Sequence, residues 1–537
     1  MDTLKEMVQT DATHTIGAAA LLGILFHLSI RPIEFEFVMF HFMAGSLLSF
    51  GGLIFAFVRL SEYGVLGGFM KASLFAGGFN AGLLSSIAIY RLFFHRCRSF
   101  PGPFRAKLTR FYAANLSAEN VQYYKELAKM HDKYGDFVRT GQREISILRK
   151  SAVPLIYGPN SECLRSTWYG QTGNDPKKCS IHMTRDFNDH RMRRRAWDRG
   201  FSIKALATHE PRIKAKADFF MSQLAKSSGK PMDMSAWAIG VEHPAIKGVH
   251  SHMAMLGIMS TVPWLLNVLG SIPGAAAGYS EFFSFCAEQI REKHKDGEKI
   301  PQDIVSWLLK AVKDKEASAS PSPAALEDDS RVVIIAGSET TATTLAGGAY
   351  YLAKCPEKQK KLQKLLDQAM PGGYGQWSCD AVKSVSYLDD FINETLRLKP
   401  ALLTGGPRET PAKGMHVDEV FIPGNTNVLI STHLIQRDPR WWQEPEEFIP
   451  ERFGEKRTEM GTDKAPYLPF SLGMCLRLPG KNVAQMSQRT SLSAIAQNFD
   501  VSFAPGEMGE EFDKEVLDAF TVTLPPIQLQ FTPRKRQ

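Results

Sequence analysis

Residues 336–341 (AGSETT) bring an acid, three hydroxyl groups and a glycine together inside an apolar helical pattern from about residue 326 to residue 352. Glycine costs a helix up to about 1 kcal/mol and threonine competes for backbone carbonyls, so this composition indicates a local function. A helix widened here would leave room for a small ligand such as dioxygen, with Thr340 donating a hydrogen bond and Glu339 relaying protons. The alternative is a polar patch that faces another helix.

Segments further along the chain add charged groups and a thiol. Glu394 and Arg397, in residues 391–400 (FINETLRLKP), share one face of a helix, a spacing that unrelated surface helices also have. Arg452 follows in residues 445–453 (PEEFIPERF) and could complete a partly buried cluster with them. Residues 469–484 (PFSLGMCLRLPGKNVA) then form a glycine-containing loop with one thiol, Cys475, before a helical segment.

In this order and spacing, the four elements resemble those of the cytochrome P450 family, and the resemblance covers the chain from about Pro101 to its end. Within the family, the sequence is most similar to fungal microsomal members that act in secondary metabolism. Residues 190–202 (HRMRRRAWDRGFS) and the apolar leader are most similar to tryprostatin B 6-hydroxylase-like enzymes. The resemblance implies a mainly α fold with a small β-sheet region and haem b, iron protoporphyrin IX with an axial cysteine thiolate, as cofactor. It also implies insertion of one oxygen atom of dioxygen into an apolar small-molecule substrate, with electrons from an NADPH-cytochrome reductase.

The resemblance assigns chemical roles to single residues. Cys475 would be the axial ligand of the haem iron, donating electron density that favours cleavage of the oxygen–oxygen bond. Glu339 and Thr340 would be the acid–alcohol pair that delivers protons to oxygen, and Ala336 and Gly337 would lie beside the oxygen pocket.

Further charged residues would hold the haem in place. His190 and Arg194, four positions apart on a helix, match the pair that family members use for a haem propionate. Arg408, which follows residues 405–407 (GGP), would be another propionate contact.

Two other charged sets would have no catalytic role. The resemblance makes Glu394, Arg397 and Arg452 a structural cluster behind the haem. The remaining face of the helix that carries His190 would be free for an acidic electron-transfer partner, although a solvated charge run is the alternative. The residues on this face are Arg191, Arg193 and Arg195.

The cysteine loop departs from the family pattern Phe-x-x-Gly-x-Arg-x-Cys-x-Gly. Counted from Phe470, the cysteine belongs at Arg477, so Cys475 comes early, and Gly473 stands where an arginine is expected before it. Three explanations are open: the loop rearranges so that Cys475 still binds iron, the protein is a degenerate member or scaffold with impaired haem binding, or the sequence is misread between residues 473 and 480. A haem protein for isomerisation or peroxide-driven oxidation is a further alternative, which Glu339 and Thr340 disfavour.

The elements that must position these residues are mostly helices. Residues 123–134 predict a helix, and residues 136–148 predict two short strands about a glycine-containing turn. A second strand region is predicted at 414–430, with a Pro-Gly turn between apolar runs. Residues 316–325, rich in Ala, Ser and Pro, predict an exposed loop between helices.

Residues 1–100 predict a membrane anchor, with apolar stretches at 16–30, 37–58 and 72–90. The last two reach the roughly 20 residues that a spanning helix needs, whereas the first is shorter and contains His27, so two or three spans are open. The basic residues at 91–98 and the Pro-Gly-Pro at 101–103 predict that residues 101–537 lie in the cytosol. The resemblance to microsomal family members implies that these residues form the catalytic domain, on a multi-pass anchor in the endoplasmic reticulum membrane. With three spans the amino terminus would face the lumen.

The cysteine spacing and the net charge bear on which classes of protein and of partner fit this chain. Seven cysteines without CxxC spacing argue against a disulfide framework and a structural zinc site. The net charge of +8 suits an acidic protein face or an anionic membrane surface, and no nucleic-acid partner is implied.

Overall fold

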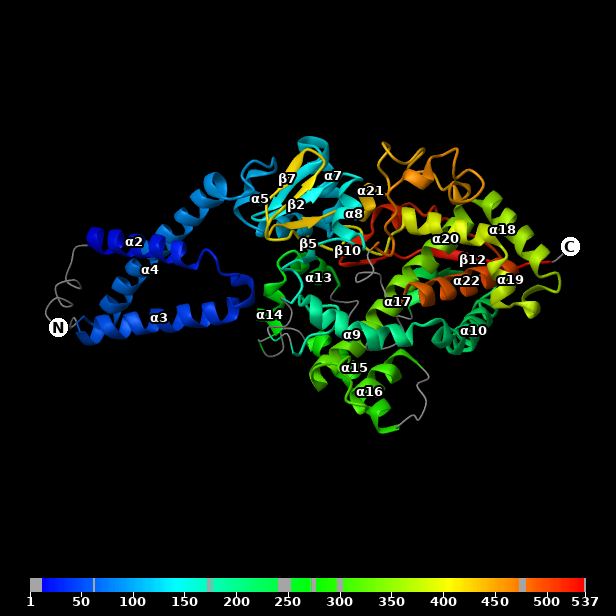
Figure 1. Cartoon of the computed structure of the whole chain (residues 1–537), viewed down its shortest axis with the longest axis horizontal. Coiled ribbons are helices and arrows are strands. Elements are labelled where there is room, and N and C mark those ends of the chain that lie inside the picture. Colours follow the sequence, from blue (N-terminus) through cyan, green and yellow to red (C-terminus); the bar gives the residue numbers. More distant parts are fainter. Residues whose placement is uncertain are drawn as a thin grey trace.

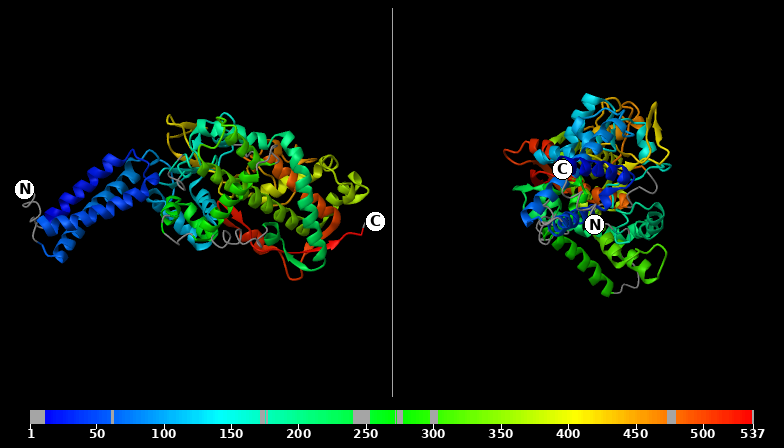
Figure 2. Two further views of the ribbon diagram at one scale, coloured as in Figure 1. Left: turned by 90° about the horizontal axis from the view of Figure 1, so that it is seen from below. Right: turned by 90° about the vertical axis from the view of Figure 1, so that its left-hand side faces the viewer.

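The structure, a computed structural model, describes residues 12–60, 63–170, 175, 177–239, 253–270, 272, 277–296, 303–472 and 480–535. Three long amino-terminal helices project from a globular part, and the two ends of the chain lie at opposite ends of the molecule (Figures 1 and 2). Helices dominate the globular part, which confirms the predicted mainly α fold with a small β-sheet region.

The apolar helices are α2 (Ala12–Ile30), α3 (Met39–Leu60) and α4 (Val65–Ile89), which continues as the π-helical turn η2 (Tyr90–Phe94). All three are long and apolar enough to cross a membrane. The helices of the globular part follow in chain order: α5 (Phe104–Leu108), α6 (Phe111–Asn120), α7 (Tyr123–Tyr134), α8 (Ala152–Tyr157), α9 (Phe187–Gly200), α10 (Ile203–Lys226), α11 (Met234–Ile239), α13 (Met253–Ser260), α14 (Trp264–Gly270), α15 (Ala277–Asp296), α16 (Ile304–Lys313), α17 (Pro323–Lys354), α18 (Pro356–Ala369), α19 (Cys379–Lys383), α20 (Ser386–Leu398), α21 (Thr432–Ile435), α22 (Lys481–Asn498) and α23 (Glu510–Lys514). Short 3-10 turns are η1 (Phe35–Phe37), η3 (Gly373–Gln376), η4 (Pro450–Phe453) and η5 (Thr462–Lys464).

The described strands form four small sheets. The largest has the order β1-β2-β8-β5-β3, with β1 (Phe137–Gly141), β2 (Glu144–Ile147), β8 (Asn427–Leu429), β5 (Arg408–Glu409) and β3 (Leu164–Arg165). The other sheets are β4-β12-β9 (Pro231–Asp233, Gln528–Pro533, Phe499–Phe503), β6-β7 (Met415–Val417, Val420–Ile422) and β10-β11 (Leu517–Ala519, Thr521–Thr523). The strand predictions at 136–148 and 414–430 are therefore confirmed.

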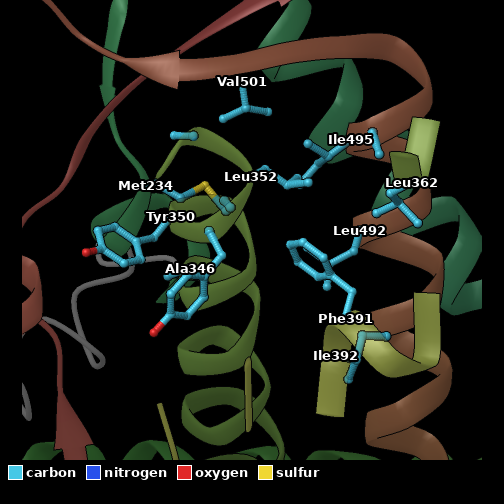
Figure 3. Packing of buried hydrophobic residues seen from close by; sticks show 14 of the residues in the cluster. Met234, Ala346, Tyr350, Leu352, Leu362, Phe391, Ile392, Leu492, Ile495 and Val501 are labelled. Atoms are coloured by element: carbon cyan, nitrogen blue, oxygen red, sulfur yellow. The ribbon is translucent and has the colours of Figure 1, made fainter. Parts of the chain in front are cut away.

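Helix α17 is the central element, and it begins at Pro323, three residues before the predicted start. Ser322 caps the helix by accepting a hydrogen bond from the backbone N–H of Ala325, and Pro323 occupies the first turn, where its missing N–H has no cost. The carboxyl-terminal half of α17 is buried against α18, α20 and α22 (Figure 3). Apolar side chains from all four helices meet there: Ala346, Tyr350, Leu352, Leu362, Phe391, Ile392, Leu492 and Ile495.

The first apolar helix is packed closely against the third. A Cβ added to Gly82 of α4 would lie 2.0 Å from the carbonyl oxygen of Ala20, and one added to Gly78 would lie 2.7 Å from that of Ile16. These glycines form a Gly-x-x-x-Gly pattern, which lets two membrane helices approach through their backbones. His27 in α2 bonds through Nδ1 to the hydroxyl of Ser86 in α4 at 2.8 Å. The polar residue of the first stretch therefore has a partner inside the bundle.

The connection between α2 and α3 contacts the globular part. Glu34 pairs with Arg185 (Nη1–Oε2 2.9 Å) and with Arg143 (Nη2–Oε1 3.2 Å). Arg185 also pairs with Glu409 of β5 at 3.0 Å, and its guanidinium lies 5.2 Å from the ring centre of Phe37. The bundle is thus held to the globular part by ion pairs as well as by the chain that leaves α4.

Two sequence expectations need correction. Residues 316–325 are not wholly an exposed loop, because Glu316 pairs with Arg199, Ser318 is buried and α17 already begins at Pro323. The first apolar helix starts at Ala12, so it is longer than the stretch 16–30.

Candidate active site

The middle of α17 borders open space. Ala336, Gly337 and Ser338 are exposed, between the half-buried residues 331–335 and the buried Glu339, and a Cβ on Gly337 would meet nothing within 4 Å in the described part of the chain. The helix is α-helical without interruption here, and the hydroxyl of Thr340 donates to the carbonyl of Ala336 at 2.8 Å. The expected widening of the helix is therefore absent: residues 336–341 keep α-helical geometry, and the threonine hydroxyl bonds the carbonyl one turn back within it.

Glu339 is hydrogen-bonded to a different element from that hydroxyl. Its side chain is buried, and its Oε2 accepts a hydrogen bond from the hydroxyl of Thr521 in β11 at 2.5 Å. Thr343, one turn further along α17, donates its hydroxyl to the carbonyl of Glu339 at 2.8 Å. The acid and the alcohol are adjacent in sequence but bonded to different elements.

Two arginines, the half-buried Arg165 and the buried Arg408, lie side by side on strands β3 and β5. Arg165 and Arg408 are paired residues in the β3–β5 ladder. Arg165 donates to the carbonyls of Ile181 (2.6 Å) and Thr184 (2.9 Å), while Arg408 donates through Nη1 to the carbonyl of Pro407 (3.0 Å) and the hydroxyl of Tyr169 (3.3 Å). Within the described residues, the buried Nε of Arg408 makes no hydrogen bond.

Two histidines lie beside these arginines, and we define Arg165, His182, His190, Arg194 and Arg408 as the arginine–histidine cluster. Burial, followed by the charge of Arg165, lowers the pKa of His190 and of His182 to about 3 each. Burial also lowers the pKa of Arg165 to about 10, with Arg408 contributing. A site that suppresses protonation and leaves a guanidinium N–H unbonded favours a bound anion.

Helix α9 presents His190 and Arg194 to this cluster. It begins at an Asp186 cap that accepts from the N–H groups of Asn188 and Asp189. His190 is buried, and Nε of Arg194 donates to Oδ1 of Asp198 at 2.6 Å. The structure therefore brings His190 near both Arg194 and Arg165, and Arg165 carried no motif in the sequence.

Arg193 is not available to an electron-transfer partner or to solvent, which corrects both sequence expectations for this residue. Its side chain is buried and Nη2 donates to the fully buried Asp329 of α17 at 2.7 Å. Asp329 also accepts from the N–H of Ile181 and the hydroxyl of Ser320, both at 2.7 Å. Arg191 and Arg195 are exposed.

Glu394, Arg397 and Arg452 form a fully buried cluster. Arg397 binds Glu394 through two hydrogen bonds (Nε–Oε2 2.7 Å, Nη2–Oε1 2.8 Å), and Nε of Arg452 donates to Oε1 at 2.9 Å. The N–H of Ile449 adds a fourth bond to Glu394 at 2.9 Å. The remaining guanidinium N–H groups donate to backbone carbonyls, namely those of Gln436, Gln443, Glu444, Pro445 and Glu447. The cluster ties α20 to the segment that leads to the cysteine loop.

Cys475, together with Gly473 and Arg477, lies outside the described residues. Phe470 before the loop packs against the main core, and Lys481 after it starts α22 with its ammonium 5.5 Å from the Phe470 ring centre. Six other cysteines are described: Cys97, Cys163, Cys179, Cys286, Cys355 and Cys379. Burial raises the pKa of each of these thiols, and raises it to about 11 for Cys286 and Cys355.

The family model for cytochrome P450 matches residues 245–531. A cytochrome P450 monooxygenase of Eupenicillium brefeldianum is 35% identical over 477 residues, which cover 85% of this chain and 95% of the relative. One of Fusarium pseudograminearum is 31% identical over 542 residues and covers 96% of this chain and 97% of the relative. Tryprostatin B 6-hydroxylase of Aspergillus fumigatus is 31% identical, with 81% of each chain covered.

Proposed function

The chain belongs to the cytochrome P450 family and is a monooxygenase of that family; we propose that it oxidises an apolar small molecule in fungal secondary metabolism. In that reaction one oxygen atom of dioxygen enters the substrate, the other leaves as water, and NADPH supplies the electrons through a flavoprotein reductase. Two observations support this: the open space beside Gly337, next to the acid–alcohol pair on α17, and the arginine–histidine cluster with its unbonded guanidinium N–H.

The described residues suit a haem group. Its two carboxylates would be held by Arg408, His190 and Arg194, with Arg165 as a further cation that the sequence did not reveal. The unbonded Nε of Arg408 supports this assignment, because a buried guanidinium N–H that lacks an acceptor is costly. When bound, the haem supplies the activation of dioxygen, with a cysteine thiolate donating electron density to the iron.

The protein's own residues would supply protons. Glu339 is buried and hydrogen-bonded, so its carboxyl is held in one place, one residue from the hydroxyl of Thr340. Thr340 can turn its hydroxyl from the Ala336 carbonyl towards the open space, because a hydroxyl rotates to suit its partner. Ala336 and Gly337 keep that side of the helix clear of side-chain bulk.

Cys475 is proposed as the iron ligand, and the alternative is a degenerate member that binds haem poorly. The test is the carbon monoxide difference spectrum of the reduced full-length protein in microsomes, for wild type, Cys475→Ala and the matched control Cys355→Ala. We expect a strongly red-shifted Soret band that Cys475→Ala abolishes and Cys355→Ala keeps. Absence of the band in membranes that contain the chain would overturn the proposal, and the transcript would then be sequenced across residues 473–480.

The apolar helices indicate a membrane anchor, and we infer three spans in the endoplasmic reticulum membrane with residues 101–537 in the cytosol. Glu34, between α2 and α3, pairs with Arg185 and Arg143 of the globular part, so this connection lies on the same side as the catalytic domain. The amino terminus and the turn between α3 and α4 then face the lumen. Exposed Arg191 and Arg195 would be available to the acidic face of the reductase.

Engineered glycosylation sites test this orientation. An Asn-Gly-Thr sequence added at the amino terminus or inserted at residues 61–62 should be glycosylated, whereas one at residues 32–33 should not. Asn115 belongs to a natural Asn-Leu-Ser sequence on the exposed side of α6 and serves as an internal cytosolic control. Modification at residues 32–33 would contradict the orientation.

A further inference from the structure

The β10–β11 hairpin, which contacts Glu339, has an unusually tight turn. Ala519 and Thr521 are paired partners, so Phe520 alone makes the turn, with φ +79°. A bulky residue rarely adopts a left-handed conformation, and such a turn persists only where its surroundings hold it. The hairpin is therefore expected to have strong contacts at its tip and along its strands.

Such contacts are present both at the tip of the hairpin and along strand β10. The ring of Phe520 stacks on Trp168 with centres 4.7 Å apart and planes 10° apart, and Nε1 of Trp168 donates to the carbonyl of Ser260 at 2.7 Å. The buried Asp518 donates its N–H to the carbonyl of Val121 at 2.7 Å and accepts from the hydroxyl of Thr404. These contacts fix the place of the next residue, Thr521.

Strand alternation then decides which side chain reaches α17. Val522 is buried and lies on the opposite face from Thr521 and Thr523. Of these two threonines, Thr521 donates its hydroxyl to Oε2 of Glu339 at 2.5 Å, whereas the buried hydroxyl of Thr523 has no hydrogen-bond partner within the described part of the chain. Thr521, which contacts Glu339, and Thr523, which does not, therefore serve as a test residue and a matched control on the same strand.

We propose that Thr521 is a positioning residue for proton delivery, which holds the carboxyl of Glu339 in the orientation from which it serves Thr340. This inference rests on the proposed relay role of Glu339. A hydroxyl has one hydrogen to donate and lone pairs to accept, so Thr521 can donate to the carboxylate and accept from the protonated carboxyl. The contact therefore persists while Glu339 gives up a proton and takes one back, and Thr521, which is only half-buried, links the acid to the solvent side of the hairpin.

The test needs no substrate. Reduction of dioxygen to water consumes twice as many electrons and protons as reduction to hydrogen peroxide, so impaired proton delivery lowers the ratio of water to peroxide. The full-length protein is reconstituted with reductase and NADPH, and NADPH oxidation and peroxide are measured in ordinary and in deuterated water. The variants are Thr521→Val, which keeps the shape but removes the hydroxyl, Thr521→Ser, which keeps the hydroxyl, the control Thr523→Val, and Glu339→Gln.

We expect Thr521→Val to lower the water-to-peroxide ratio roughly tenfold, the size expected for loss of one hydrogen bond to a charged group. The solvent isotope effect on NADPH oxidation should change with it, which a merely structural defect would not cause. Thr521→Ser should restore both readouts, and Thr523→Val should leave them as in the wild type. In a Glu339→Gln background, Thr521→Val should add no further loss, because both changes act through one contact.

Three outcomes separate this inference from the proposed function. If Glu339→Gln lowers the ratio but Thr521→Val does not, the positioning role is refuted and the relay stands. A full additional loss from Thr521→Val on top of Glu339→Gln also refutes it. If Glu339→Gln leaves the ratio unchanged in a protein with a normal carbon monoxide spectrum, the relay role of Glu339 fails, and this inference fails with it.

Discussion

Replacing Glu394 by Gln tests a charge that is fully buried. Glu394 accepts four hydrogen bonds, three of them from the guanidinium groups of Arg397 and Arg452, and all three side chains are 0% exposed. The glutamine keeps the size of the side chain and one acceptor oxygen, but its NH₂ group faces a guanidinium N–H. Two buried cations then lack their anion.

The expected loss in free energy of unfolding follows from the burial of Glu394 and its two arginine partners. Removal of one partner of a buried ion pair destabilises a protein by about 3–5 kcal/mol, because the other charge stays desolvated. Glu455→Gln is a matched control in the same region: Glu455 pairs with Lys361 at 2.9 Å, but its side chain is 66% exposed. An exposed pair contributes only about 0–1 kcal/mol.

The assay is urea unfolding of the full-length protein in detergent micelles, followed by the fraction that resists a brief protease pulse. The wild type and both variants are compared through the urea midpoint, which reports stability when the slope is unchanged. We expect Glu394→Gln to unfold at a clearly lower urea concentration and Glu455→Gln to unfold close to the wild type. If the free energies of unfolding of the two variants agree within about 1 kcal/mol, the reasoning from burial is refuted.

Three further predictions concern other parts of the chain. Burial raises the pKa of Asp518 to about 6, so the folded state keeps this proton to higher pH than the unfolded chain does, and stability falls as the pH rises from about 4 to about 6, by up to about 3 kcal/mol. Asp518→Asn should remove this dependence, and urea midpoints at both ends of that range would show it. Gly82→Leu should separate α2 from α4, since a Cβ there would lie 2.0 Å from the carbonyl oxygen of Ala20; a cysteine pair engineered across the two helices would then fail to crosslink. Arg408→Leu should speed haem transfer to excess apomyoglobin about tenfold or more, while the exposed Arg195→Leu should leave the rate unchanged, and equal rates would contradict the assigned propionate contact.

The sequence predicted those helices, strands and side-chain pairs that are formed by residues close together in the chain. The helix at 123–134 coincides with α7, and the strands at 136–148 appear because adjacent apolar runs about a turn pair with each other. Glu394 and Arg397 meet because their spacing fixes it, and Arg452 joins them from a nearby segment.

The missed contacts join residues far apart in the chain. Arg165 and Arg408 sit on strands of two residues each, too short for any periodicity to appear. The partner of Arg193, Asp329, is 136 positions away, so the sequence predicted that this arginine is free for an acidic partner, with a solvated charge run as the alternative. The contact between Glu339 and Thr521 spans 182 positions and depends on a one-residue turn that no composition rule predicts.

The ion pairs of Glu34 give the catalytic domain two attachments to its anchor, one covalent and one electrostatic. A single tether would let the domain swivel over the bilayer, whereas two separated points remove most rotational freedom and fix which face meets the lipid. The second attachment involves half-exposed charges, so salt weakens it. Ionic strength should therefore change the tilt of the domain on the membrane without releasing it, and polarised absorption of oriented bilayers, through the angle of the haem plane, would record that change.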